Sequence, residues 1–299
     1  MKNNKKTSKN NKKLATKKLI NDYLRKRNNK VIIGNWKTNK KFHDIKAYAH
    51  EYNLLVRRDK VLKHLNFIIG IAPTLVGLLP VRGLMGKNVN AVAQHVTFHK
   101  NGAFTGQVSY DQVHEYNVNY AIVGHSEARK YLNVTDTFCR DSIKALVGAN
   151  MRPVLCVGEE ESQYSAGKSK KVVMLQLMNC LKDLKEDEVR QVIIAYEPIW
   201  AIGQKVASHD WIVSMTKFIR KSVADLFDHK TAKEVHVLYG GSVNAQNAKD
   251  ILGINGVDGV LVGGASLKPL TFYEIICAAP EYQYVRSVLF PPKHKKNKK

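Results

Sequence analysis

A chain of 299 residues, 44% of them hydrophobic, is long enough to bury a large core, and barrels of alternating strands and helices take about 250 residues as one domain. The four cysteines are far apart and show no CxxC or Cys/His ligand spacing, which argues against a disulfide framework or a zinc module and favours reduced core thiols in a cytoplasmic protein. No apolar run approaches the ~20 residues of a membrane span, and residues 1–30 lack the apolar centre of a signal peptide, so we expect no membrane insertion.

The net charge of +23 is concentrated at the two ends of the chain. Residues 1–30 carry twelve Lys and Arg against one acid, residues 293–299 carry five lysines, and the body between them keeps only +7. Both ends are rich in Lys and Asn, so we expect them to be solvated and largely disordered, with a short basic helix over residues 14–27 as the alternative for that part. Such ends can bind polyanions weakly, such as RNA or an anionic membrane surface, but residues that stack on or read bases are missing, so no specific nucleic acid is expected.

We divide the chain into a basic extension (1–29), a barrel domain (30–290) and a basic tail (291–299).

Eight apolar, strand-like runs follow one another between the charged ends. They cover residues 31–34, 67–72, 89–96, 120–124, 154–158, 192–196, 235–239 and 259–262. Most intervals contain a segment of helical period, clearest at 137–151, 172–184 and 211–227. Eight such units without a flexible linker predict an α/β fold, a single (β/α)₈ barrel. The alternative, an open α/β sheet, lacks the GxGxxG fingerprint that would support a dinucleotide site.

Polar residues and glycines cluster where these strands are expected to end. In chain order they are Asn35-Trp36-Lys37, His125-Ser126-Glu127, Glu197, Gly240-Gly241-Ser242 and Gly263-Gly264. Taken singly, each has a structural explanation as a solvated charge, a helix cap or a turn. Because the carboxyl ends of parallel strands meet at one mouth of a barrel, the five together predict a catalytic site there.

The chemistry of this set is specific. Backbone N–H groups of the glycine turns after the last two strands can cradle a phosphate. One carboxylate, Glu197, can take a proton from a carbon next to a carbonyl, while His125, Asn35 and Lys37 stabilise the enediolate that forms. Neither a metal cluster nor a Ser or Cys paired with a base is evident, so hydride transfer and hydrolysis are disfavoured.

The region from about Val31 to about Ala279 resembles the triosephosphate isomerase family. The matching segments are residues 34–39, 102–106, 122–127, 195–203, 239–243 and 262–267. The resemblance implies interconversion of dihydroxyacetone phosphate and D-glyceraldehyde 3-phosphate, a step of glycolysis and gluconeogenesis, in a homodimer without cofactor or metal.

The same resemblance assigns roles to individual residues. It implies that Glu197 shuttles the proton, that neutral His125 acts as the electrophile, that Lys37 supplies positive charge and that Asn35 donates a hydrogen bond. The phosphate would be held by four residues, Gly203, Ser242, Gly263 and Gly264. Glu127 and Thr105 are implied as further residues of the site.

The sequence departs from the family pattern in three places. Ala128, Gln107 and Val134 stand where the family has an Arg and two acids that form an ion cluster between subunits. Replacing the whole cluster by neutral groups costs little, whereas one charge left unpaired costs several kcal/mol. The lid over residues 202–207 is one residue shorter than in the family, and the basic ends have no family counterpart.

Two rival interpretations stay open at this point. A sugar-phosphate epimerase or synthase would keep the glycine cradle without the Asn-Trp-Lys, His-Ser-Glu and Tyr-Glu-Pro motifs. A non-catalytic relative that binds RNA or a surface would tolerate loss of Lys37, His125 or Glu197, all of which are present.

Overall fold

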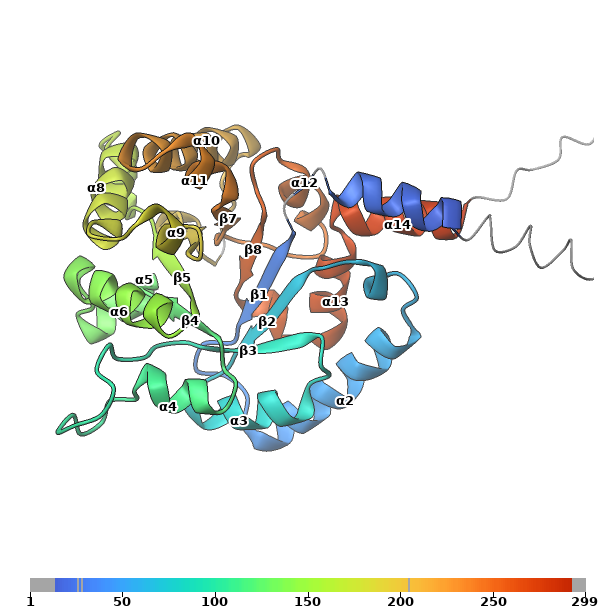
Figure 1. Ribbon diagram of the computed structural model, residues 1–299, viewed down its shortest axis with the longest axis horizontal. Coiled ribbons are helices and arrows are strands. Elements are labelled where there is room, and N and C mark those ends of the chain that lie inside the picture. The colour runs from blue at the N-terminus through green and yellow to red at the C-terminus, as the bar shows by residue number, and fades with distance from the viewer. Residues whose placement is uncertain (1–13, 26, 28, 204, 292–299) are drawn as a thin grey trace, which may run out of the picture.

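The computed structural model describes residues 14–25, 27, 29–203 and 205–291. Within them eight parallel strands close into a barrel in sequence order, so the predicted (β/α)₈ fold is confirmed (Figure 1). The strands are β1 (Val31–Asn35), β2 (Ile68–Ala72), β3 (Val89–Ala93), β4 (Tyr120–Val123), β5 (Arg152–Val157), β6 (Ile193–Tyr196), β7 (His236–Tyr239) and β8 (Gly259–Val262).

Helices surround the strands on the outside of the barrel (Figure 1). They are α2 (Phe42–Arg58), α3 (Leu75–Leu84), α4 (Tyr110–Glu115), α5 (Ser126–Leu132), α6 (Asp136–Gly148), α7 (Glu161–Ser165), α8 (Ser169–Leu181), α9 (Glu186–Val189), α10 (His209–Leu226), α11 (His229–Glu234), α12 (Ala248–Gly253), α13 (Pro269–Cys277) and α14 (Pro280–Leu289). Short 3₁₀ turns occur at η1 (Leu62–His64), η2 (Ile199–Ala201) and η3 (Gly264–Leu267). No helix of the described residues is long and apolar enough to cross a bilayer.

Strand side chains alternate between two apolar cores, as expected for strands that are covered on both faces. Val31 and Ile33 belong to the cluster inside the barrel, whereas Ile32 belongs to the larger cluster between strands and helices. The four cysteines are free thiols, three of them buried, in line with the expectation of core thiols.

The strand register brings the predicted site residues to one end of the barrel. Asn35 pairs with Ala72, and Tyr196 pairs with both Val157 and Tyr239. Glu197, directly after Tyr196, therefore lies at the same edge as Asn35. The strand expected over residues 89–96 ends at Ala93, because the side chain of the next residue, Gln94, donates to the main-chain carbonyls of Lys37 and Ala72.

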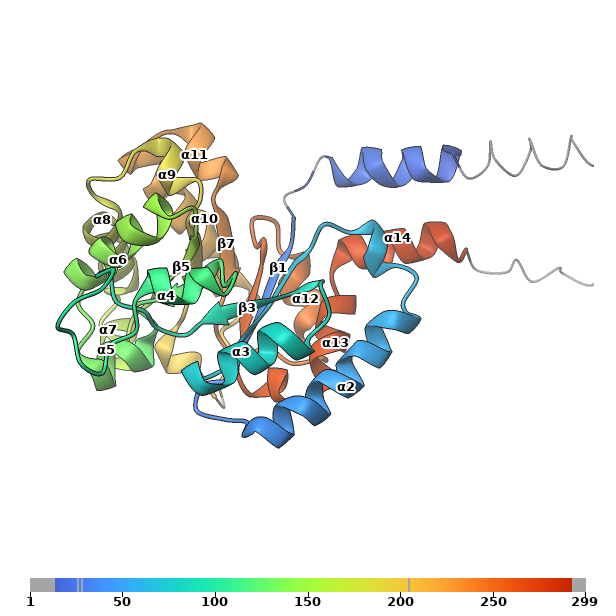
Figure 2. The same ribbon diagram turned by 60° about the horizontal axis from the view of Figure 1, so that its bottom comes forward.

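Residues 14–24 form a helix that lies along α14 (Figures 1 and 2). The Tyr23 and Tyr284 rings stack with centroids 3.7 Å apart, and Ile20 is only 3% exposed. The expectation of a solvated, disordered extension is therefore wrong for this part, where the short-helix alternative holds, because Ile20 is buried in the apolar core and Tyr23 stacks on α14. Residues 1–13 and 292–299 of the predicted basic ends lie outside the described residues.

Candidate active site

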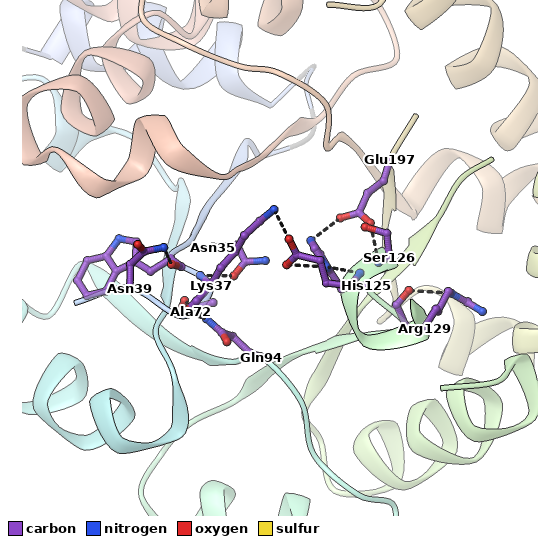
Figure 3. A network of polar contacts seen from close by, with 12 residues as sticks. Asn35, Lys37, Asn39, Ala72, Gln94, His125, Ser126, Arg129 and Glu197 are labelled. Carbon is purple, nitrogen blue, oxygen red and sulfur yellow. Dashed lines mark hydrogen bonds and ion pairs between the residues drawn. The ribbon is translucent and has the colours of Figure 1, made fainter. Parts of the chain in front are cut away.

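Asn35 is the last residue of β1 and Lys37 follows the strand, and a tight turn fixes both (Figure 3). The Asn35 Oδ1 accepts a hydrogen bond from the Lys37 N–H at 3.0 Å, and Lys37 has a φ of 51°, in the left-handed region that non-glycine residues rarely occupy. The Gln94 Nε2 donates to the Lys37 carbonyl at 2.9 Å and to the Ala72 carbonyl at 2.8 Å. These contacts hold the strained turn, from which the Lys37 ammonium reaches the Glu127 Oε1 at 2.7 Å.

His125 occupies the N-cap of α5, where its ring orientation is set by the backbone. Its Nδ1 accepts the Glu127 N–H at 3.2 Å, so the proton of a neutral ring lies on Nε2. That Nε2 is 3.1 Å from the Glu197 Oε1, and both side chains are almost completely buried. The imidazole can therefore present an N–H donor toward the barrel mouth.

Glu197 follows β6 and is 2% exposed (Figure 3). Its Oε2 accepts the Ser126 N–H at 3.1 Å. Two glycines make room for it: a Cβ on Gly158 would lie 1.7 Å from the Glu197 carbonyl oxygen, and a Cβ on Gly240 would lie 2.9 Å from the Glu197 Cγ. The carboxylate is thus positioned by close backbone packing, with Oε1 facing the His125 Nε2 and Oε2 accepting the Ser126 N–H.

Glycine turns line the same cavity, whose volume is about 340 Å³. The lining includes Gly203, Ser242, Gly263 and Gly264, and the cavity also reaches Asn35, Lys37, His125 and Glu197. The Ser242 hydroxyl lies 2.9 Å from the Ala201 carbonyl and 3.1 Å from that of Gly203, which ties the turn after β7 to the lid. Gln204, at the lid tip, lies outside the described residues.

Two of the sequence-predicted residues do not line this cavity. Glu127 pairs with Lys37, which does line it. Thr105 is exposed in the loop between β3 and α4, apart from the residues that line the cavity. No group of three or more His, Cys, Asp or Glu arranged to hold a metal ion occurs among the residues that the structure describes.

Two residues with a supporting role were missed by the sequence reasoning. One is Gln94, described above. The other is Glu159, a fully buried carboxylate that accepts hydrogen bonds from the Trp200 Nε1 at 2.8 Å and the Tyr196 hydroxyl at 3.0 Å. Burial, followed by the nearby Glu159 charge, raises the pKa of Tyr196, so this hydroxyl stays a donor. Both residues follow closely on a strand end, the signal that located the other site residues.

The fold is a closed parallel barrel, and its mouth holds a buried carboxylate, an imidazole, an ammonium and glycine turns. This fold and this site define an isomerase that acts on a phosphorylated carbonyl compound. Residues 30–279 match the family model described as triosephosphate isomerase. Proteins named triosephosphate isomerase include one from Mycoplasmoides gallisepticum, 38% identical over 83% of this chain and 97% of the relative, and one from Francisella philomiragia, 37% identical over 83% of this chain and 96% of the relative. One from Mycoplasma genitalium is 35% identical over 82% of this chain and 97% of the relative. The chain belongs to the triosephosphate isomerase family.

Proposed function

We propose that this chain interconverts dihydroxyacetone phosphate and D-glyceraldehyde 3-phosphate by proton transfer through an enediolate, in glycolysis and gluconeogenesis. The observation that carries the proposal is the buried Glu197–His125 pair, with 3.1 Å between Oε1 and Nε2, in the same cavity as the glycine turns. A substrate of three carbons with a phosphate at one end fits such a site, because acid–base groups and glycine turns line one cavity.

The geometry supports a division of labour among the side chains. Glu197 takes a proton from the carbon next to the carbonyl and returns it to the neighbouring carbon. His125 Nε2–H donates to the oxygen on which negative charge develops, and Lys37 and Asn35 stabilise that charge. The phosphate binds against Gly203, Ser242, Gly263 and Gly264, and neither metal nor cofactor takes part.

We also propose that the protein is a cytoplasmic homodimer built through the loop that contains Thr105. This loop is exposed and carries Phe104, which is stacked on His99 with centroids 3.8 Å apart. A cavity of about 460 Å³ beside it is lined by Gln107 and Val134 and could receive the loop of a second copy. The exposed apolar residues Leu75, Val76, Leu79 and Leu132 give such an interface apolar area. The barrel domain of residues 30–290 is the unit that would pair.

A coupled assay that follows each product tests the activity. We expect the purified chain to turn over both triose phosphates, and Glu197→Gln to lower kcat by a factor of about 10²–10⁴ with the fold intact. Glu51→Gln, an exposed residue of α2, is the matched control and should keep the full rate. If Glu197→Gln keeps more than about a tenth of the rate, the base is misassigned; if wild type turns over neither substrate, the proposed function fails.

A further inference from the structure

Two cysteines of neighbouring helices lie together outside the strands of the barrel. Cys139 is on α6 and Cys180 is on α8, and these two helices pack against each other. Both residues are fully buried, and a hydrogen bond joins the two thiols. Neither residue lines the catalytic cavity, so the proposed reaction leaves this pair without a role.

A partly exposed ion pair covers the two thiols. The Arg129 Nη1 and the Asp136 Oδ1 are 2.6 Å apart, and these side chains are 19% and 25% exposed. The Cys180 Sγ donates to the same Asp136 Oδ1 at 3.5 Å and accepts from the Arg129 Nη2 at 3.9 Å. The thiols therefore lie one contact below the surface, and a molecule as small as hydrogen peroxide can reach them when the ion pair opens locally.

The two thiols differ in acidity. The hydrogen bond with Cys180 lowers the pKa of the Cys139 thiol, burial opposes this shift, and the Arg129 charge supports it. The same hydrogen bond, together with burial, raises the pKa of the Cys180 thiol. Because the thiolate is the nucleophile, Cys139 is the sulfur that attacks an oxidant first, and Cys180 is the partner that resolves the product.

We propose that Cys139 and Cys180 form a redox switch, in which hydrogen peroxide converts the two thiols into a disulfide that slows isomerisation. In the first step the Cys139 thiolate attacks a peroxide oxygen, the O–O bond breaks, and a sulfenic acid forms. The hydroxide that leaves takes up the proton that Cys139 had lost. In the second step the Cys180 sulfur attacks the Cys139 sulfur, the S–O bond breaks and water leaves. Two thiols and one peroxide thus become one disulfide and two waters.

The disulfide would act on the site through the residue that precedes His125. Gly124 has a φ of 69°, and a Cβ there would lie 2.6 Å from the Cys139 Sγ and 2.9 Å from the Arg129 Nη2. The Arg129 Nε also donates to the Gly124 carbonyl at 2.8 Å, close to His125 (Figure 3). Disulfide formation brings two sulfur atoms from hydrogen-bond distance to covalent distance, so it draws Cys139 toward α8 and away from Gly124. The main chain that positions His125 thereby loses a packing contact, and small displacements of a catalytic group lower kcat.

Mass spectrometry of the full chain after treatment with hydrogen peroxide tests the proposal. After alkylation and tryptic digestion without reductant, residues 131–140 and 172–182 should appear as one linked species, which dithiothreitol separates. The kcat of the same sample should fall by at least about fivefold and recover with dithiothreitol. Cys139→Ala and Cys180→Ala should form no linked species, and each should keep the rate that it has before treatment. The control, Cys277→Ala, should respond as wild type does.

Cys277 is more exposed than the other three cysteines, so oxidation governed by exposure alone would modify Cys277 and leave the pair reduced. That result would overturn the proposal, as would linkage of the two peptides only in urea. Inactivation of Cys139→Ala and Cys180→Ala to the same extent as wild type would show that another group is the target. A linked pair with unchanged kcat would contradict the effect on the site. This effect rests on the proposed function, whereas the linkage is measured without the isomerase assay, so the two failures are distinguishable.

Discussion

Single residues at the strand ends decide the geometry of the site. Glu197 is nearly unexposed and is surrounded by positions where only glycine fits, so its place is set by backbone packing. His125 is fixed by one backbone hydrogen bond to its Nδ1. The constraint on His125 is local in sequence, whereas Gly158 and Gly240 are far from Glu197 along the chain, so the sequence motifs indicated the base without showing what positions it.

Gly240→Ala tests the backbone constraint on the proposed base. The new Cβ would lie 2.9 Å from the Glu197 Cγ, so the carboxylate must shift, and a displacement of about 1 Å can cost a factor of about 10² in kcat. Gly148→Ala is the matched control, because a Cβ there meets nothing within 4 Å. Steady-state kinetics compare the two variants. A kcat for Gly240→Ala equal to that of the control would show that Glu197 tolerates displacement.

The strands of the barrel could be predicted from the sequence more easily than the side-chain hydrogen bonds that link them. The eight strands are continuous apolar runs, so their order and ends could be predicted to within a few residues. Gln94 and Glu159 were missed because their partners, such as Lys37 and Trp200, are far away in sequence and a polar residue after a strand also fits a turn. Long-range hydrogen bonds leave no periodic signal, so only the folded barrel reveals them.

Glu159→Leu tests the hydrogen bonds that join the segment after β5 to β6 and to η2. Two donors, the half-buried Trp200 indole and the buried Tyr196 hydroxyl, would lose their acceptor, which should lower the free energy of unfolding by about 2–4 kcal/mol. Glu159→Gln keeps one acceptor oxygen and should lose less. Urea denaturation measures both, and a loss for Gln as large as that for Leu would rule out the hydrogen bonds as the cause.

Ala128→Arg tests the neutral interface that we propose for the dimer. Gln107 and Val134 offer no carboxylate, so a lone guanidinium buried between subunits should weaken the dimer by several kcal/mol. Adding Gln107→Glu and Val134→Glu should recover the loss, and Ala47→Arg, exposed on α2, should change nothing. Sedimentation equilibrium gives the dimer constants. A tighter dimer from Ala128→Arg alone would contradict this interface.

At the scale of the whole molecule, a family barrel carries an added helix pair at the end away from the site. Charge composition alone predicted a solvated extension, because the few apolar residues that pack change the composition of a Lys-rich segment very little. The stacking of Tyr23 on α14 depends on where the other end of the chain lies, which the sequence of either segment does not reveal.

Ile20→Ala tests this packing against a matched control in the same helix. Ile20 is 3% exposed and Leu19 is 52% exposed, so Ile20→Ala should lower Tm and speed tryptic cleavage near residue 25, while Leu19→Ala should change neither. Neither variant should alter kcat/KM, since the helix is remote from the cavity. Loss of isomerase activity in Ile20→Ala at a temperature where the barrel is folded would show that the extension acts on the site.

Proton transfer by Glu197 can be followed directly by NMR of dihydroxyacetone phosphate incubated with the protein in D₂O. A carboxylate that takes the proton exchanges it with solvent, so deuterium should appear on the carbon next to the carbonyl, and Glu197→Gln should slow its appearance by a factor of about 10²–10⁴. Deuterium that appears with Glu197→Gln as fast as with wild type would mean that Glu197 does not take the proton, and would contradict the proposed mechanism.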